Sequence, residues 1–354
     1  MKIITIIGTR PQFIKSAPVS RELIKSGIKE ILIHTGQHFE DNMSDVFFRQ
    51  MNIPKPKYFL NIHSLKHGSM TGQMLEKIEE ILFIEKPEYV MVYGDTNSTL
   101  AGALAASKLH IKIIHVEAGL RSFNMIMPEE INRIITDRLS FYLFCPTDTA
   151  IKNLENEGFI NYDCRMIKSG DVMQDAAIMF EKYSQKPEID IHDEFILCTL
   201  HRQENTDDEI RLNSILNALS AISEKKKIIF PVHPRTQKKI LQYNFNPDLY
   251  KNIKMTRPVG YLEILYLLKN CSFVITDSGG LQKEAFFFRK LCLTLRDETE
   301  WVELLENGFN FIASGNCEKI LKNYERLISA NPDFNINLYG NGKASQLIVK
   351  ELSK

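Results

Sequence analysis

The sequence lacks the cysteine spacing of a metal site and has no excess of charge of one sign. Its six cysteines include no CxxC pair, and its two histidine pairs at i, i+4 spacing, His34/His38 and His63/His67, lack the glutamate of an HExxH motif. We therefore predict buried reduced thiols and no metal site. The 44 basic and 44 acidic residues cancel, which argues against a general nucleic-acid or membrane-surface binder. Any bound anion must then be held by local groups.

Long apolar runs and a dinucleotide fingerprint are also missing. The N-terminus, MKIITIIG, is too short for a signal peptide or a membrane span, so we expect a cytoplasmic protein with no membrane partner. No G-x-G-x-x-G follows a predicted strand, and Gly340-Asn341-Gly342 is interpreted as the turn before a last helix at 344–352. This absence argues against a tightly held nicotinamide, and we predict no cofactor.

Short β-rich runs alternate with helix-length segments along the whole chain. Several of the runs are apolar on both faces, as parallel strands covered by helices must be. The pattern predicts an α/β protein with two doubly wound domains that face a cleft: residues 1–170, residues 171–340, and a terminal segment 341–354. The predicted strands are 2–7, 30–34, 88–93, 112–116, 141–145 and 165–168, then 195–200, 227–232, 252–255, 273–275 and 291–295.

Polar groups follow nearly every predicted strand, where ligands bind in sheets of this kind. The stretch 115–133, HVEAGLRSFNMIMPEEINR, has the highest density of them. It places Glu117, Arg121, Glu129 and Glu130 between a buried strand and a helix that begins near Pro128. Asp95 ends the neighbouring strand. Carboxylates are costly to bury unless chemistry needs them, so we interpret the stretch as catalytic. The alternative is a solvated loop whose acidic residues complement a helix dipole.

The strongest phosphate signal is the segment 276–284, TDSGGLQKE. A strand ends there, Ser278, Gly279 and Gly280 let backbone approach a ligand, and the helix N-terminus that follows favours an anion. Glu284 lies one turn later, where it can accept ribose hydroxyls. The alternative is an ordinary strand–helix turn with an Asp or Ser cap. Arg10 and Lys15 flank another helix start and either reach a ligand or are two exposed basic residues.

Taken together, these motifs resemble the non-hydrolysing UDP-N-acetylglucosamine 2-epimerases. The resemblance implies two Rossmann-like domains of the glycosyltransferase-B type, a last helix packed on the first domain, a homodimer, and a role in surface polysaccharide biosynthesis. It also implies an isomerase that interconverts UDP-N-acetylglucosamine and UDP-N-acetylmannosamine by eliminating and re-adding UDP, with no cofactor. The matching stretches are GTRPQFIK (8–15), TGQH (35–38), YGDTNSTLAGALAA (93–106), HVEAGLRS (115–122), PEEINR (128–133), LHRQEN (200–205), PVHP (231–234), TDSGGLQKEA (276–285) and LRDETE (295–300).

The resemblance assigns roles to the matching positions. It makes Asp95, Glu117 and Glu129 the acid–base and charge-stabilising carboxylates. It places His201 and Arg10 against the diphosphate and Lys15 beside the sugar–phosphate region. Ser278, Gly279 and Gly280 would bind phosphate, Glu284 the ribose, and Gln37 and His38 an activating second UDP-sugar. Arg121 and Arg296 are the candidates for contacts with a carboxylated sugar.

The chain departs from the glucosamine enzymes at one sugar-side position. Trp301, the only tryptophan, stands where those enzymes have an arginine. Together with the stretch GTRPQFIK, this tryptophan makes the chain resemble relatives that act on UDP-2,3-diacetamido-2,3-dideoxyglucuronate. The alternative is that Trp301 is a core residue with no contact to the sugar. In the glucosamine enzymes an arginine helps bind an activating second UDP-sugar. The segment 63–68 of this chain has no clear counterpart of that arginine. Other open functions are a hydrolysing 2-epimerase, a glycosyltransferase and a non-catalytic UDP-sugar sensor.

Overall fold

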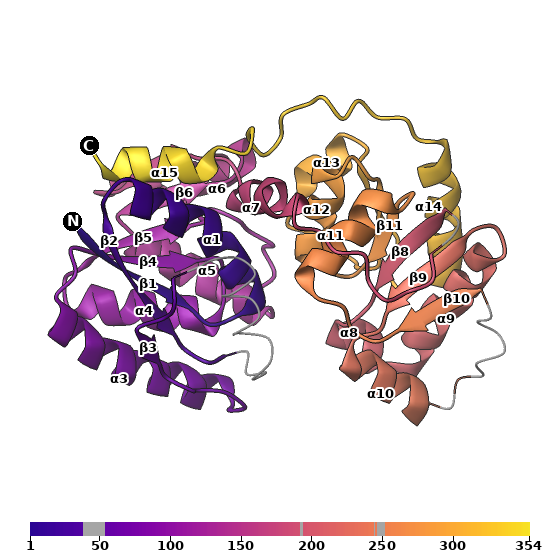
Figure 1. Cartoon of the computed structure of the whole chain (residues 1–354), viewed down its shortest axis with the longest axis horizontal. Helices are drawn as coiled ribbons and strands as arrows, with labels where there is room; N and C mark the ends of the chain where they lie inside the picture. Colours follow the sequence, from indigo (N-terminus) through magenta and orange to yellow (C-terminus); the bar gives the residue numbers. More distant parts are fainter. Residues whose placement is uncertain (38–53, 192–193, 244, 246–251) are drawn as a thin grey trace. The chain divides into compact units, whose positions relative to one another are not determined.

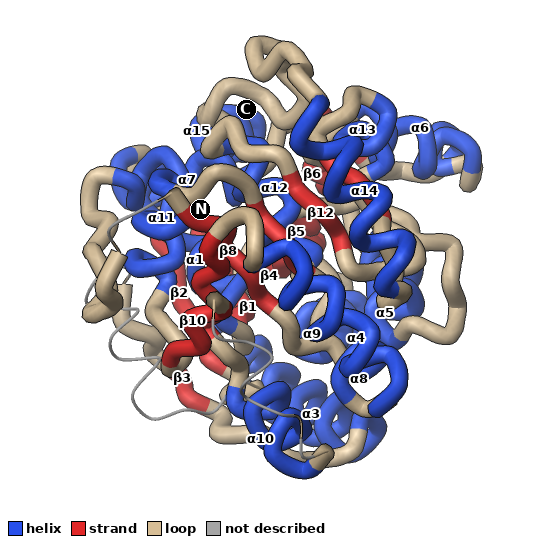
Figure 2. The backbone as a smooth tube through the Cα atoms, turned by 90° about the vertical axis from the view of Figure 1, so that its right-hand side faces the viewer, coloured by secondary structure: helices blue, strands red, loops and turns tan. Residues whose placement is uncertain are grey.

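The computed structural model describes the chain except residues 38–53, 192–193, 244 and 246–251. Two compact units divide it: unit 1 comprises residues 1–179 with 337–354, and unit 2 comprises residues 180–336. Each unit is built on one parallel sheet flanked by helices (Figures 1 and 2). The division falls inside helix α7 (Val172–Glu181), later in the chain than residue 170.

Unit 1 contains a seven-stranded sheet in the order β3-β2-β1-β4-β5-β6-β7. Every strand pair in it is parallel. Its elements are β1 (Lys2–Ile7), α1 (Arg10–Lys25), β2 (Lys29–His34), β3 (Tyr58–Phe59), α3 (His67–Glu85), β4 (Tyr89–Tyr93), α4 (Asn97–Lys108), β5 (Lys112–Val116), α5 (Pro128–Leu139), β6 (Tyr142–Cys145), α6 (Asp148–Asn156), the 3-10 turn η1 (Phe159–Asn161), β7 (Arg165–Lys168), α7 (Val172–Glu181) and α15 (Ala344–Leu352).

Unit 2 repeats this winding in a six-stranded parallel sheet, β10-β9-β8-β11-β12-β13. Its elements are β8 (Phe195–Thr199), α8 (Gln203–Thr206), α9 (Glu209–Ser223), β9 (Lys227–Pro231), α10 (Pro234–Gln242), β10 (Ile253–Thr256), α11 (Tyr261–Asn270), β11 (Val274–Thr276), α12 (Gly279–Phe287), β12 (Cys292–Thr294), α13 (Val302–Glu306), β13 (Asn310–Ile312) and α14 (Cys317–Ser329).

The predicted α/β class and its parallel, doubly wound sheets are confirmed. Every predicted strand is present with small shifts at its ends, and the structure adds two short strands, β3 and β13, at a sheet edge of each unit. These two were missed because so few residues show no alternation of apolar and polar side chains. No helix among the described residues is both long enough and apolar enough to cross a membrane.

The sheet of unit 1 is buried on both faces, which explains its continuous apolar strands. Ile4 and Ile6 of β1 pack with Met74 and Ile78 of α3 in one cluster, while Ile3 and Ile7 are equally buried. Helix α15 packs beside α1, where the last and first segments of the chain meet (Figure 1).

The first turn of α15 is held by the side chain of Asp175 in α7. This carboxylate accepts the backbone N–H groups of Ala344 at 3.1 Å and Ser345 at 2.8 Å. Burial raises the pKa of Asp175 above its ordinary value, an effect that these hydrogen bonds oppose. The last helix is thus fixed to unit 1 by a specific cap as well as by apolar packing.

The winding of each sheet reverses once, between β1 and β4 in unit 1 and between β8 and β11 in unit 2. In open α/β sheets, ligands bind beside such a reversal at the carboxyl ends of the strands. Arg10 follows β1, Asp95 follows β4, His201 follows β8 and Ser278 follows β11. The fold therefore places candidate residues at the reversal of each unit.

Candidate active site

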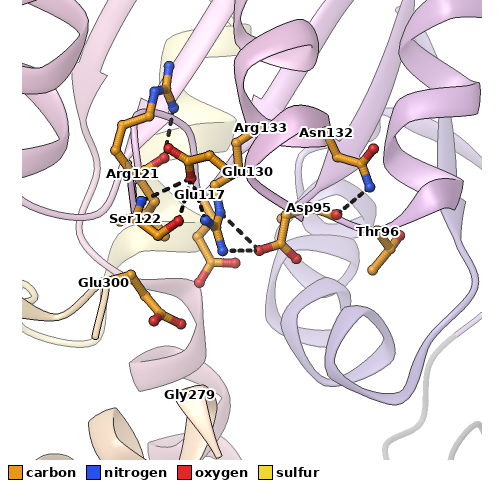
Figure 3. A network of polar contacts seen from close by, with 12 residues as sticks. Asp95, Thr96, Glu117, Arg121, Ser122, Glu130, Asn132, Arg133, Gly279 and Glu300 are labelled. Atoms are coloured by element: carbon orange, nitrogen blue, oxygen red, sulfur yellow. Dashed lines mark hydrogen bonds and ion pairs between the residues drawn. The ribbon is translucent and has the colours of Figure 1, made fainter. Parts of the chain in front are cut away.

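Asp95 lies in the tight turn between β4 and α4, beside Gly94 with a φ of 62°. Thr96 caps α4 by accepting the N–H of Thr99. The side chain of Asp95 is 32% exposed, and Arg133 of α5 donates to its Oδ2 through Nη2 at 2.7 Å and Nε at 3.0 Å (Figure 3). Because both contacts use Oδ2, Oδ1 remains available to a ligand.

Arg133 is in turn held by Glu130, one helical turn earlier in α5. Its Nη1 donates to Oε2 of Glu130 at 2.7 Å. The same carboxylate accepts the backbone N–H groups of Ser122 at 2.9 Å and Phe123 at 3.0 Å (Figure 3). Burial alone would raise the pKa of Glu130, but these N–H groups and Arg133 hold it below its ordinary value. Glu130 is therefore an ionised structural group that fixes the loop before α5.

Glu129 differs from Glu130 in its environment. Its side chain is exposed in the first turn of α5, while Glu130 is 1% exposed. Of the two adjacent glutamates, only Glu129 is accessible to a ligand. The structure thus places the predicted catalytic candidate on the solvent side and its neighbour inside.

Glu117 follows β5 directly and is 7% exposed. It forms an ion pair with Lys15 of α1, so the first helix supplies a cation to the carboxylate at the end of β5. Its backbone has a φ of 75°, a left-handed conformation that is uncommon outside glycine. The structure thus pairs Lys15 with Glu117, a contact that the sequence analysis did not predict.

Arg121 and Arg296, predicted as sugar ligands, are instead buried and paired. Nη1 of Arg121 donates to Oδ2 of Asp137 at 2.7 Å, and its Nε and Nη2 donate to Glu157 at 2.6 Å and 2.9 Å. Arg296 is 2% exposed and its Nη1 lies 2.9 Å from Oε2 of Glu300. Both guanidinium groups are thus buried beside carboxylates, and Nη1 of Arg296 also lies 3.7 Å from the Cβ position of Gly279 at the start of α12.

Gln37 and Gln12 join the strand ends of unit 1. Oε1 of Gln37 accepts the hydroxyl of Ser98 at 2.7 Å, while His38 lies outside the described residues. Gln12, which the sequence interpretation did not select, accepts the N–H of Gly8 at 2.8 Å and donates to the carbonyl of Tyr93 at 2.8 Å. It therefore ties the turn after β1 to the turn after β4.

In unit 2, α12 begins at Gly279 directly after β11, and Ser278 caps it. The first N–H groups of a helix have no intrahelical acceptor and favour an anion. Added to Gly279, a Cβ would approach Oε1 of Glu300 to 2.6 Å, whereas at Gly280 it would meet nothing within 4 Å. Glu284, one turn later, is 5% exposed. The segment thus presents a capped helix N-terminus with open space at Gly280.

His201 is oriented by Asp277, the residue that follows β11. Its Nδ1 lies 3.0 Å from Oδ1 of Asp277, which is fully buried, while the imidazole is 41% exposed. The backbone N–H groups of His201 and Arg202 donate to Oδ2 of Asp277 at 3.0 Å and 2.9 Å. Burial alone would raise the pKa of Asp277, but His201 and these N–H groups hold it below its ordinary value. With Nδ1 engaged, Nε2 is the atom that His201 offers to a ligand.

Trp301 is buried, so the alternative of a core residue is confirmed. It is 3% exposed, its indole N–H donates to the carbonyl of Gly279 at 3.0 Å, and Nζ of Lys283 lies 3.9 Å from its ring centroid. The tryptophan therefore packs against the first turn of α12 and is too buried to form an apolar surface for a sugar.

The two units offer complementary chemistry. Unit 1 carries the carboxylates Asp95, Glu117 and Glu129 with Lys15, a set suited to moving a proton to and from carbon. Unit 2 carries a helix N-terminus and an oriented histidine, a set suited to a diphosphate. Within the described ranges, no three His, Cys, Asp or Glu side chains gather as metal ligands would.

Comparison with known proteins gives a consistent set of relatives. The sequence model of the UDP-N-acetylglucosamine 2-epimerase family matches residues 21–353. The UDP-2,3-diacetamido-2,3-dideoxy-D-glucuronate 2-epimerase of Pseudomonas aeruginosa is 52% identical, with 100% of both chains covered. The UDP-GlcNAc 2-epimerase of Methanocaldococcus jannaschii, solved in complex with UDP-GlcNAc and UDP, matches with a TM-score of 0.92 and 45% identity over 100% of this chain and 99% of that one.

A more distant match concerns the fold alone. The glycosyltransferase SsfS6 of Streptomyces sp. SF2575 shares 12% identity and superposes with a TM-score of 0.55 over 99% of both chains. The architecture of two doubly wound units is thus shared with a glycosyltransferase.

Proposed function

Because the chain belongs to the family of UDP-N-acetylglucosamine 2-epimerases, we propose that it is an isomerase that inverts C2 of a UDP-2-acetamido sugar without hydrolysing it. UDP-N-acetylglucosamine, converted to UDP-N-acetylmannosamine, is the proposed substrate. The observation that carries this function is the pair Asp95 and Glu117 at the ends of adjacent strands. Two carboxylates so placed can remove a proton from one face of a carbon and return it to the other.

The C2 hydrogen of an acetamido sugar is not next to a carbonyl, so deprotonation needs help from C1. When the C1–O bond to UDP breaks, positive charge develops at C1 and the C2 proton becomes acidic. A carboxylate takes that proton, which leaves a 2-acetamidoglucal and UDP. UDP then adds back to C1 while a carboxylic acid protonates C2 from the opposite face. Asp95, Glu117 and Glu129 supply these groups, and Lys15 balances the charge of Glu117.

Departure of UDP requires stabilisation of the diphosphate. We assign this to Ser278, Gly279 and Gly280 at the start of α12, with Nε2 of His201 and the side chain of Arg10, and the ribose to Glu284. A helix N-terminus and a cationic side chain such as that of Arg10 both favour the developing negative charge. No redox cofactor takes part in this sequence of steps, since the same UDP leaves and returns.

A second candidate substrate is UDP-2,3-diacetamido-2,3-dideoxyglucuronate. It is favoured by the relative from Pseudomonas aeruginosa, which is 52% identical over the full length and carries that sugar in its name. Against it, Arg121 and Arg296 are buried in ion pairs, so the sugar carboxylate would need another cation. Arg10 is the candidate, since it follows β1 at the reversal of the sheet.

The biological setting is proposed from the family. We propose a cytoplasmic homodimer that supplies a UDP-sugar for surface polysaccharide biosynthesis, with Gln37 and His38 contributing to the binding of an activating second UDP-sugar. Light scattering of the purified protein tests the dimer. Initial rates across UDP-N-acetylglucosamine concentrations test activation, because an activating second molecule makes the dependence sigmoidal.

One experiment tests the proposed reaction. The protein is incubated with UDP-N-acetylglucosamine in heavy water and C2 is followed by NMR. Epimerisation through the glucal replaces the C2 proton with deuterium and forms UDP-N-acetylmannosamine. Free sugar with UDP would identify a hydrolysing enzyme, and no exchange would contradict the proposal. A comparison of kcat/KM with the diacetamido sugar decides between the two substrates.

A further inference from the structure

Glu117 has a backbone conformation that side chains rarely adopt. Its φ is 75°. Gly94, at the end of the neighbouring strand, has a φ of 62°, and Gly119, two residues after Glu117, has a φ of 78°. The two glycines adopt such angles without steric cost, but a glutamate does not. A residue in this region persists only where the surrounding structure holds it there. The groups that hold Glu117 can be identified.

Asp137 of α5 accepts hydrogen bonds from both sides of Glu117. Its Oδ1 lies 2.6 Å from Nδ1 of His115, two residues before Glu117. Its Oδ2 accepts the backbone N–H of Gly119 at 3.1 Å and Nη1 of Arg121 at 2.7 Å. The carboxylate of Asp137 is fully buried. Asp137 thus contacts both the strand end before Glu117 and the turn after it, while the backbone N–H groups of Glu117 and Ala118 donate to the carbonyl of Phe144 at 3.0 Å.

His115 extends this connection to the turn that carries Asp95. Its Nε2 lies 2.8 Å from the carbonyl oxygen of Gly94, and the ring is fully buried. A carbonyl only accepts, so Nε2 donates to it, and Nδ1 faces a carboxylate, which accepts when ionised. His115 therefore bridges Asp137 to Gly94 through its two ring nitrogens.

The polar groups around Asp137 are paired with one another. Asp137 of α5 faces both His115 and Arg121, and Glu157, at the end of α6 and 27% exposed, pairs with Arg121 from the other side. Burial alone would raise the pKa of Asp137, but His115 and Arg121 hold it below its ordinary value. The neighbouring thiol of Cys145 stays neutral, because burial raises its pKa. A complete set of partners makes such a group rigid, and the loss of one charge leaves the others buried without compensation.

We propose that Asp137 is a positioning residue for the epimerisation. Through Gly119 it holds Glu117 in its left-handed conformation, and through His115 and Gly94 it holds the turn that carries Asp95. The two carboxylates that act at C2 are thereby kept at a fixed separation by one buried side chain that touches neither of them. This proposal rests on the function proposed above. Displacement of a catalytic group by about 1 Å costs on the order of a hundredfold in rate, so the effect on turnover is measurable.

The test is Asp137→Asn, which preserves the shape of the side chain and removes its charge. We expect kcat to fall about a hundredfold, with deuterium exchange at C2 falling in proportion. KM and the affinity for UDP, measured by calorimetry, stay within about threefold, because the proposed UDP ligands of unit 2 do not touch Asp137. A folded variant that retains more than half of the wild-type kcat overturns the proposal, as does a loss confined to KM.

Glu85→Gln is the matched control. Glu85 is also a buried carboxylate of unit 1 with several partners, among them Tyr58 at 2.6 Å and Lys2. It lies beside Lys2 at the start of β1, and the site follows the other end of that strand. We expect Glu85→Gln to lower the unfolding temperature and leave kcat unchanged. If it lowers kcat as much as Asp137→Asn does, the effect at Asp137 is one of general stability and the proposal is overturned.

Two further measurements keep the proposal testable if Asp137→Asn fails to fold. His115→Asn removes the donor to Gly94, and we expect at least a tenfold loss of kcat with UDP affinity retained; unchanged kcat overturns the proposal. In the wild-type protein labelled with 15N-histidine, NMR at neutral pH should show both ring nitrogens of His115 protonated, and a neutral ring overturns it. The ring spectrum does not depend on turnover, so a wild type without C2 exchange refutes the proposed function alone.

Discussion

Asp95 and Glu117 are held in different ways although they end adjacent strands. Asp95 is 32% exposed and bound through one oxygen by Arg133. Glu117 is nearly buried and paired with the ammonium group of Lys15. Unequal environments for two carboxylates are what a pair needs when one must release a proton while the other accepts one. The structure therefore supports separate roles for the two residues.

We predict that Asp95→Asn and Glu117→Gln each reduce kcat by about a hundred to ten-thousandfold, the usual contribution of a general acid or base. The affinity for UDP, measured by calorimetry, should stay within a few-fold. Glu88→Gln, an exposed carboxylate just before β4, serves as the control with unchanged activity. More than a third of wild-type activity in either variant would remove that residue from the mechanism.

The left-handed backbone of Glu117 predicts a conflict between stability and activity. Both Glu117→Ala and Glu117→Gly lose the carboxylate and its ion pair, so their difference isolates the backbone. At a φ of 75°, we expect the glycine variant to be more stable by about 1 kcal/mol in denaturant unfolding. Glu76, on the exposed face of α3, is the control, where alanine should exceed glycine by about the same amount. An advantage of alanine at position 117 would show that the conformation is unstrained.

Sequence reasoning could propose the candidate residues that follow strands, but not the residues that orient them. Asp95, Glu117, His201 and Gly279 could be predicted because a strand end next to a helix start exposes polar groups in a known direction. The partners Arg133, Asp137 and Asp277 could not be separated from ordinary surface charge, since pairing across helices and strands depends on tertiary contacts. For the same reason, Arg121 and Arg296 were expected to bind a ligand and are instead in buried ion pairs.

At the scale of the element, α12 depends on residues from outside the helix. Trp301 donates to the carbonyl of Gly279 at 3.0 Å, and the side chain of Gln282 accepts the hydroxyl of Thr299 at 2.7 Å. Both contacts come from the segment before α13. These two hydrogen bonds thus fix the first turn of α12, and its N–H groups keep the orientation that favours an anion.

We predict that Gly279→Val weakens UDP binding at least tenfold. An added Cβ would approach Oε1 of Glu300 to 2.6 Å, and the branched side chain would also occupy the space beside the helix N-terminus that a phosphate needs. Gly72→Val is the matched control, because Gly72 lies in α3 with nothing within 4 Å of its Cβ position. Unchanged UDP affinity in a folded Gly279→Val protein would place the phosphate site elsewhere.

The elements that sequence reasoning recovered are those with a strong local signal in their own residues. The central strands are continuous apolar runs, and α5 begins at a proline followed by two acidic residues, a pattern typical of a helix start. The strands β3 and β13 contain two and three residues. They exist because a neighbouring strand offers them free backbone partners, which their own residues do not reveal.

At the scale of the whole molecule, acid stability depends on carboxylates with depressed pKa values. Lys57 and Tyr58 hold the pKa of Glu85 at about 2, below its ordinary value of 4.5. Such a group stabilises the fold above its unfolded pKa, and the contribution is lost as the pH falls through the folded value. Glu85 therefore stabilises the protein at neutral pH and loses this effect between about pH 4.5 and 2.

We predict that Glu85→Gln lowers the midpoint of urea unfolding at pH 7 and that its difference from wild type shrinks as the pH approaches 2. Glutamine has no charge to lose, so only the wild type titrates in this range. Glu80→Gln, which removes an exposed pair with Lys77 in the same helix, should change the midpoint little at either pH. A difference that stays constant from pH 7 to pH 2 would contradict the assigned pKa.

The position of α15 has a consequence for the order in which the protein matures during translation. Unit 2 is one continuous segment, whereas unit 1 is completed only by residues 337–354. While the ribosome is still adding those residues, α1 lacks the helix that packs beside it and Asp175 lacks the N–H groups that it caps. The domain that is synthesised first is therefore the one that finishes folding last, and a released chain truncated before residue 344 should expose unit 1 to protease while unit 2 stays resistant.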